Sequence, residues 1–160
     1  MGNVGSRLIF ATMVLCGTGA AQAACSPGTL ELRGPSGNQR FSVEVVDTPA
    51  EQAQGLMFRE KLAASAGMLF VFPEPKHAQF WMKNTLIPLD MIFADAAGRV
   101  TRIHPQAKPL DTTAIDGGEN VTFVLEINGG LAERLGLAEG ALMRSDVINQ
   151  SGAVWPCTAE

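Results

Sequence analysis

One stretch decides the fold: Phe80-Trp81-Met82-Lys83-Asn84-Thr85-Leu86-Ile87-Pro88-Leu89-Asp90. It combines large apolar side chains with a cation, an amide, a hydroxyl and a carboxylate. Pro88 donates no hydrogen bond to a sheet ladder and holds the residue before it extended. We therefore predict a strand over residues 78–82, a break at residues 83–85 and a second strand from Leu89. Asp90 falls inside an apolar run, where a carboxylate requires a cation, hydrogen-bond donors or water.

The residues before this stretch predict further strands and a helix. Residues 30–33 and 41–46 are short extended runs joined by a Gly- and Pro-rich turn, which indicates a hairpin. Thr48-Pro49-Ala50-Glu51 has the pattern of a helix start, with a capping residue, a proline in the first turn and an acid that closes a capping box. Residues 68–72 are wholly apolar and predict a central strand that is buried on both faces.

The residues after it complete a mainly β domain. Residues 89–94 and 99–104 flank a turn and predict a second hairpin. Residues 105–120 show no apolar period and predict a long loop. Further on we expect a strand over residues 121–127, a short helix over 131–135 that ends at Gly136, and a last strand over 141–148. About eight strands and two short helices indicate a single antiparallel sandwich or barrel domain.

Residues 1–23 have the layout of a secretory signal peptide: a basic Arg7, a short apolar run and small residues before a cleavage site after Ala23. The apolar run is too short for a permanent anchor, so we expect no membrane span after cleavage and a periplasmic or secreted product. The alternative is a lipoprotein with its lipid on Cys25. Gln22 disfavours that alternative, because a lipoprotein signal needs a Leu-like residue there.

Two cysteines, Cys25 and Cys157, remain at the two ends of the mature chain. In an oxidising compartment this even pair predicts a disulfide that ties the termini together, and the alternative is two free thiols with a nucleophilic role. The chain holds 12 basic and 16 acidic residues, and the signal peptide contains only one of them, Arg7. This acidic balance argues against a nucleic-acid partner, which requires a basic surface.

Three blocks of residues resemble a known family. They are Gly55-Leu56-Met57-Phe58-Arg59, Gly67-Met68-Leu69-Phe70-Val71-Phe72-Pro73, and Phe80-Trp81-Met82-Lys83-Asn84-Thr85 with Ile87-Pro88-Leu89-Asp90-Met91. In order and spacing they closely resemble the bacterial and archaeal family called domain of unknown function 192. The resemblance covers about residues 41–147, implies a compact, jelly-roll-like β fold that is often exported, and implies no substrate, because the family has no established activity. We divide the chain into a signal peptide (1–23), an N-terminal segment (24–40), a β-rich domain (41–150) and a C-terminal tail (151–160).

The break in the central stretch is the candidate site. Arg59 and Lys83 are the residues we expect to hold an anionic group of a ligand, with Trp81 as an apolar wall. Asn84 and Asp90 complete this pocket. The structural alternative is that an acid such as Asp90 neutralises Arg59 and locks the break in the sheet.

Other chemistry has weaker support. Either histidine, His77 or His104, is a candidate general base with Asp90 or Asp111 behind it, and the alternative for both is a surface or loop-anchoring role. No histidine has a partner at metal-ligand spacing, so we expect no metal, and no motif indicates a cofactor. The methionines of the three blocks are expected to fill the core rather than to bind copper. A carboxylate pair for sugar hydrolysis would come from Asp90, Asp111, Glu119 or Glu126, and the sequence selects none of them.

Three functions therefore remain open. The first is an exported, non-catalytic domain that binds a small polar or anionic ligand, or an envelope partner, through Arg59, Trp81, Lys83, Asn84, Asp90 and His104. The second is a small periplasmic hydrolase or lyase that uses Asp90 and His104 as a carboxylate–histidine pair. The third is a purely structural envelope protein.

Overall fold

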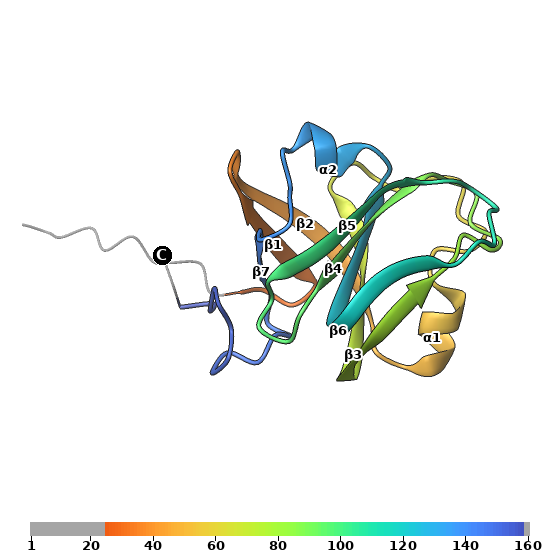
Figure 1. Cartoon of the computed structure of the whole chain (residues 1–160). Helices are drawn as coiled ribbons and strands as arrows, with labels where there is room; N and C mark the ends of the chain where they lie inside the picture. The colour runs from red at the N-terminus through yellow and green to blue at the C-terminus, as the bar shows by residue number, and fades with distance from the viewer. Residues whose placement is uncertain (1–24, 159–160) are drawn as a thin grey trace, which may run out of the picture.

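The chain folds around one seven-stranded sheet that curls into a half-barrel (Figure 1). The structure is a computed structural model that describes residues 25–158, so the predicted signal peptide lies outside the described residues. The strand order across the sheet is β5-β4-β6-β3-β2-β1-β7. The elements are β1 (Thr29–Gly34), β2 (Gly37–Val46), α1 (Pro49–Gln54), β3 (Ala66–Phe80), β4 (Leu89–Ala94), β5 (Val100–Ala107), β6 (Ile115–Asn128), α2 (Leu131–Arg134) and β7 (Leu142–Arg144).

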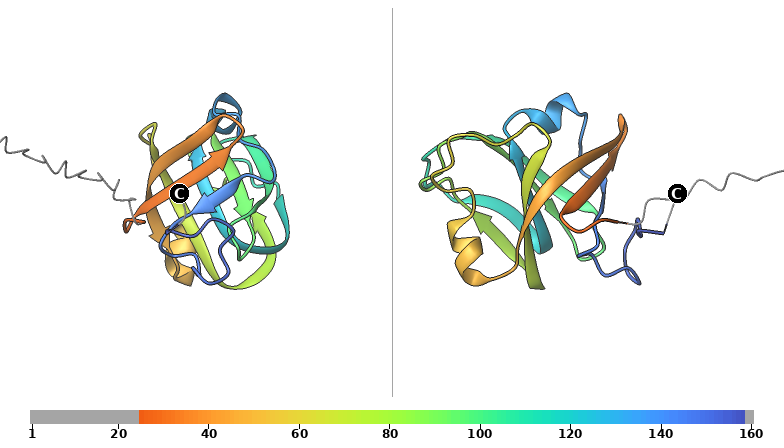
Figure 2. Two further views of the ribbon diagram at one scale, coloured as in Figure 1. Left: turned by 90° about the vertical axis from the view of Figure 1, so that its left-hand side faces the viewer. Right: turned by 180° about the vertical axis from the view of Figure 1, so that it is seen from behind.

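The two edges of the sheet approach each other. Strands β5 and β7 stand at opposite ends of the strand order, yet a bridge joins Arg99, just before β5, to Leu142 in β7. Beside it the amide of Val100 donates to the carbonyl of Ala141 over 2.9 Å. Figure 2 shows the curl from two further sides. Such partial closure leaves little free sheet edge at this point, which is where an open sheet would be prone to pair with another chain.

The mainly β, mostly antiparallel fold is confirmed, with seven strands rather than about eight. Five of the six neighbouring strand pairs are antiparallel, and β2 and β3 run parallel. A parallel pair needs a crossover connection, and the segment that contains α1 supplies it.

One correction concerns the strand predicted over residues 68–72. It is part of β3, which does not end at Pro73 and Pro75 but continues past them to Phe80. The register of β3 against β6 shifts between Val71 and Lys76. A bulge accommodates prolines in this way, because it leaves the bulged residues outside the ladder.

A second correction concerns the loop predicted over residues 105–120. Strands β5 and β6 occupy all of that segment except residues 108–114. Gly117 explains why the sequence does not show the start of β6: a Cβ at this position would lie 2.3 Å from the ring of Phe93. Glycine is therefore required by packing, although in a sequence it reads as a strand breaker.

Both predicted helices are confirmed. Helix α1 begins with the predicted capping box, in which the amide of Glu51 donates to Thr48 Oγ1 (3.3 Å) and the amide of Thr48 donates to the Glu51 carboxylate (3.2 Å). Gln52 then donates to the carbonyls of Val46 (3.3 Å) and Val71 (2.8 Å). These bonds fix α1 against β2 and β3.

Two apolar cores lie on the two faces of the sheet. Residues of β6 alternate between them, with Leu125 in the first core and Val124 in the second. The first core joins side chains of β1, β2 and β7 to the side chains on one face of β4 and β6. The second core lies under the loops beside α1 and contains the methionines Met68, Met82 and Met91, which are buried as expected for core-filling residues.

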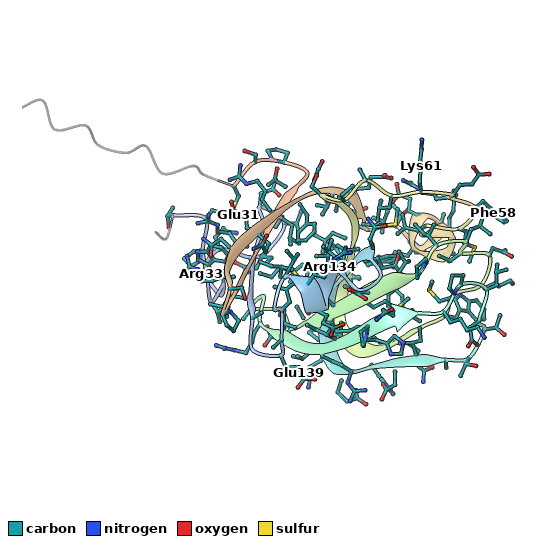
Figure 3. The ribbon with its side chains drawn as sticks, turned by 90° about the horizontal axis from the view of Figure 1, so that it is seen from above. Glu31, Arg33, Phe58, Lys61, Arg134 and Glu139 are labelled. Atoms are coloured by element: carbon teal, nitrogen blue, oxygen red, sulfur yellow. A yellow bond between two sulfur atoms is a disulfide. The ribbon has the colours of Figure 1, made fainter. Side chains whose placement is uncertain are left out.

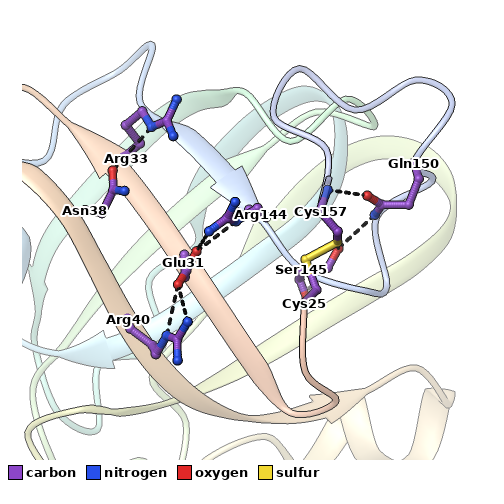
Figure 4. A network of polar contacts seen from close by, with 9 residues as sticks. All are labelled: Cys25, Glu31, Arg33, Asn38, Arg40, Arg144, Ser145, Gln150 and Cys157. Carbon is purple, nitrogen blue, oxygen red and sulfur yellow. Dashed lines mark hydrogen bonds and ion pairs between the residues drawn. A yellow bond between two sulfur atoms is a disulfide. The ribbon is translucent and has the colours of Figure 1, made fainter. Parts of the chain in front are cut away.

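A disulfide joins Cys25 to Cys157, as predicted (Figure 4). The tail before Cys157 is packed onto the sheet, because Trp155 is buried and the guanidinium groups of Arg33 and Arg144 lie 4.0 and 4.2 Å from the centre of its ring. The disulfide therefore closes a loop whose two ends are already anchored, one by β1 and the other by Trp155.

We expect the double substitution Cys25→Ser and Cys157→Ser to lower the free energy of unfolding. The bridge spans 132 positions, and on the chain-entropy model a loop of this length contributes about 4–5 kcal/mol. Urea unfolding of the chain without residues 1–23 measures the loss, and a chemically reduced wild-type sample should match the variant. Titration of two reactive thiols in the unreduced protein would contradict the bridge.

Candidate functional site

Three loops are joined side by side at one end of the sheet: the segment after α1 that contains Phe58, the loop between β3 and β4, and the loop between β5 and β6 that contains Leu110. The central loop, residues 81–88, receives a hydrogen bond at the Asn84 carbonyl from the amide of Phe58 (2.8 Å). On its other side the amide of Leu110 donates to the carbonyl of Thr85 (3.1 Å). In Figure 3 this end of the molecule is the one that carries the labelled residues Phe58 and Lys61, and Glu31 and Arg33 lie at the other end. The predicted break in the sheet is therefore a loop held on both sides.

Asp90 lies in β4 and is fully buried. Its Oδ1 accepts hydrogen bonds from the amides of Gln106 (2.7 Å) and Gly130 (2.8 Å), and its Oδ2 accepts one from the amide of Ala132 (2.7 Å). In the cross-strand register Asp90 pairs with Ile127, a member of the first core. The carboxylate is thus satisfied by three backbone donors, which join β4 to β5 and to the start of α2.

A cavity of about 250 Å³ opens on the other face of the sheet. Helix α1 and the residues after it form one wall, and β3 forms another with the rings of Phe70, Phe72 and Phe80. Trp81 and Thr85 from the central loop complete its mouth. Trp81 is 52% exposed, so a large aromatic face stands at the entrance.

Glu126 of β6 lines the same cavity and is only 4% exposed. In the register it stands opposite Met68 of β3 and Met91 of β4, both members of the second core. Within residues 25–158, no ion pair joins its carboxyl group to a cation, and the group lines the cavity instead of meeting another side chain. Burial raises the pKa of Glu126 to about 8, because desolvation disfavours the charged form.

Two lysines lie at the rim. The ammonium of Lys76, which lines the cavity, is 4.2 Å from the centre of the Phe72 ring. The ammonium of Lys83 is 5.3 Å from the centre of the Trp81 ring. Both are cation–π contacts, so the aromatic faces at the rim already attract ammonium groups.

The structure brings together some of the predicted site residues and separates others. Trp81 lines the cavity, whereas Lys83 and Asn84 do not and instead contact residues that do: the ammonium of Lys83 lies over the Trp81 ring, and the amide of Asn84 donates to the sulfur of Met57 (3.8 Å). Arg59 does not line the cavity and makes two hydrogen bonds with the carboxylate of Glu44, of 2.5 and 2.6 Å.

Asp90 and His104 do not line the cavity either. Asp90 faces the first core, and His104 lines a separate hollow together with Lys108 and Asp111. Asp90 and His104 share no hydrogen bond among the interactions of the described part of the chain. His77 lies on the surface, where its hydrogen bond to Asp116 (2.7 Å) raises its pKa.

In the sequence, Glu126 is one of four carboxylates that were equal candidates for an acid pair. The signal that could have found it is the one that singled out Asp90: an acid between Leu125 and Ile127 within a run of apolar residues. Lys76 carried no signal, because the strand was expected to end before it. As for metals, the described residues contain no group of three or more His, Cys, Asp or Glu side chains that could hold an ion.

The fold and the cavity define a small, disulfide-closed β domain with one buried, unpaired carboxyl group under three joined loops. The chain belongs to the family of domain of unknown function 192, described as uncharacterized ACR, whose model matches residues 32–145. The resemblance of the three sequence blocks is thereby confirmed.

Solved structures agree with this assignment. A protein of unknown function from Novosphingobium aromaticivorans DSM 12444 shares 43% identity and a TM-score of 0.71, over 78% of this chain and 93% of that one. A protein from Sinorhizobium meliloti 1021, described as a "putative transcription regulator", shares 38% identity and a TM-score of 0.71, over 75% of this chain and 94% of that one. No curated protein matches the sequence. Neither helix in residues 25–158 is long and apolar enough to cross a membrane.

We expect Asp90→Asn to destabilise the fold by about 1–3 kcal/mol, because its single oxygen can still accept from Gln106 and Gly130 while its NH₂ group faces the buried amide of Ala132 and leaves that donor unsatisfied. Urea unfolding measures the loss. The matched control is Asp111→Asn, since Asp111 is exposed and accepts one bond from the amide of Thr113. Equal small losses in the two variants would show that the three bonds to Asp90 do not hold the sheet together.

The raised pKa of Glu126 gives a pH dependence with a definite sign. The native state holds this proton up to about pH 8, while the unfolded chain releases it near 4.5. Stability should therefore fall as pH rises from 4.5 to 8, by at most about 1.4 kcal/mol per pH unit from this group. The measurement is urea unfolding of wild type and Glu126→Gln from pH 5 to 9. The free energy of unfolding of the variant, relative to that of wild type, should increase as the pH rises toward 8. A difference between wild type and Glu126→Gln that does not change with pH would refute the assignment.

Proposed function

We propose that this protein is an exported, non-catalytic domain that binds a small polar ligand in the cavity under the three loops. The observation that carries the proposal is the carboxyl group of Glu126, which is buried, unpaired and lines that cavity. A buried polar group without a partner costs free energy, so its presence requires a reason. A ligand that supplies the missing partner is such a reason.

The lining of the cavity supports this proposal. Ligand sites in proteins combine apolar and aromatic walls with a few polar groups that fix orientation. Here the rings of Phe70, Phe80 and Trp81 are the walls, and Glu126 and Gln79 supply polar groups. The volume of about 250 Å³ suits a small molecule rather than a peptide.

The alternatives have less support. A carboxylate–histidine hydrolase or lyase would need Asp90 beside His104, but the oxygens of Asp90 are already occupied by three backbone amides. A purely structural role explains Asp90 but gives no use for Glu126. A regulator that binds nucleic acid, as the description of the S. meliloti protein suggests for that relative, fits poorly with the acidic balance of this chain. Export and an envelope partner remain part of the proposal, since they follow from the predicted signal peptide.

A thermal-shift screen of small polar molecules at pH 7 tests the proposal. Ligands should raise the melting temperature by mass action. Trp81→Ala and Glu126→Gln should each weaken a hit at least tenfold. Leu110→Ala is the matched control, because Leu110 is an exposed apolar residue of the same loop end that does not line the cavity. The proposal fails if no molecule binds, or if the hits bind the cavity variants as tightly as wild type.

A further inference from the structure

We propose that the ligand of this cavity is a small organic cation, whose ammonium group lies between the carboxyl group of Glu126 and the aromatic rings of Phe70, Phe80 and Trp81. This inference rests on the proposed function and adds the chemical class of the ligand. It replaces the expectation of an anionic ligand, because Arg59 and Lys83, the two cations on which an anion site depended, do not line the cavity, and Arg59 is paired with Glu44.

The first argument is the missing partner of Glu126. A buried carboxyl group is stable if it is protonated or if it meets a cation. Within the described chain no cation reaches it, and the cavity gives a ligand access to it. An ammonium group would supply the opposite charge at the same point. An anion would instead meet a like charge as soon as Glu126 ionised.

The second argument is the character of the walls. The rings of Phe70 and Phe80 pack edge to face, 5.1 Å apart at an angle of 84°, and both border the cavity. Aromatic faces attract cations, and the effect is larger in sites that exclude water. At the rim, the protein's own ammonium groups of Lys76 and Lys83 already occupy the faces of Phe72 and Trp81. These lysines show which kind of group the rings accept.

Lys76 is the one feature that favours an anion. Lys76 and Glu126 are the charged residues that line the cavity, since α1, the residues after it and the central loop contribute uncharged side chains there. Lys76 is exposed, in the bulged part of β3, and its long side chain can turn into water. Glu126 is fixed inside the sheet. Charge interactions are far stronger for a desolvated group than for an exposed one, so Glu126 decides the class of ligand.

Binding must then depend on pH. A quaternary ammonium keeps its charge at every pH, whereas Glu126 must lose its proton to pair with it. Affinity should therefore rise about tenfold per pH unit below the pKa of Glu126, about 8, and level off above it. One proton should be released for each ligand bound at pH 7.

The experiment is calorimetric titration with choline and benzyltrimethylammonium from pH 6 to 9. The matched control ligand is 3,3-dimethyl-1-butanol, an uncharged molecule with the shape of choline, and benzoate is the anion. We expect the cations to bind at least tenfold tighter than both controls. Glu126→Gln should lower their affinity at least tenfold and abolish its rise with pH. Lys76→Gln should leave the affinity unchanged or raise it, since it removes a competing cation.

The outcomes separate the two proposals. If neither cation binds better than its uncharged control, the cation inference is wrong, whatever else binds. If benzoate or a neutral molecule binds and is lost in Trp81→Ala, the cavity is a ligand site of another class and the proposed function stands. If Lys76→Gln abolishes cation binding, the cation inference is also wrong, because Lys76 should not contribute to the binding of a cation. If the wider screen finds no ligand at all, both proposals fall together.

Discussion

The three amide hydrogen bonds that converge on Asp90 are the constraint on which the loop end of this protein depends. They require β4 to present a carboxylate to the face where the chain after β6 turns into α2. A slip of one residue would place Asp90 in the second core and expose its apolar neighbours to the wrong face. The register of β4 is thereby fixed, and so is the end of the loop that precedes it.

Glu126 lies on the neighbouring strand, but its environment differs from that of Asp90. Both acids interrupt apolar runs in the middle of the sheet, and both are buried. Asp90 meets backbone donors on its face, whereas Glu126 faces methionines, aromatic rings and an open cavity. One acid stabilises the fold, and the other reduces stability at neutral pH for as long as no partner is bound. Proteins keep such unfavourable groups at functional positions.

The distribution of cations around the cavity follows the same logic. Arg59, the strongest candidate for holding an anion, is paired with Glu44. Lys83 and Lys76 lie over aromatic rings at the rim instead of reaching the buried acid. The proposed site therefore combines aromatic walls and the buried carboxyl group of Glu126 with two exposed lysines near its entrance. An ammonium compound could displace the ammonium group of one of these lysines from its aromatic ring, and this supports the proposed class of ligand.

The sequence by itself determined the mainly β fold, the capping box of α1, a break in the chain before Leu89, the disulfide partners and the family, although it placed the end of the strand before the break at Met82 and not at Phe80. These features depend on local patterns: alternation, proline and glycine positions, a capping pair and the two cysteines that follow the predicted signal peptide. Only the tertiary structure decided that β3 passes its prolines through a bulge and that Gly117 belongs to a strand, because each depends on what the neighbouring strand places opposite. It alone also distinguished Asp90 from Glu126. Both read as acids in apolar runs, and the donors that satisfy the first come from residues 16 to 42 positions away in the chain. No local pattern contains that information, since it arises only when the sheet brings distant amides to one side chain and leaves the other facing a cavity.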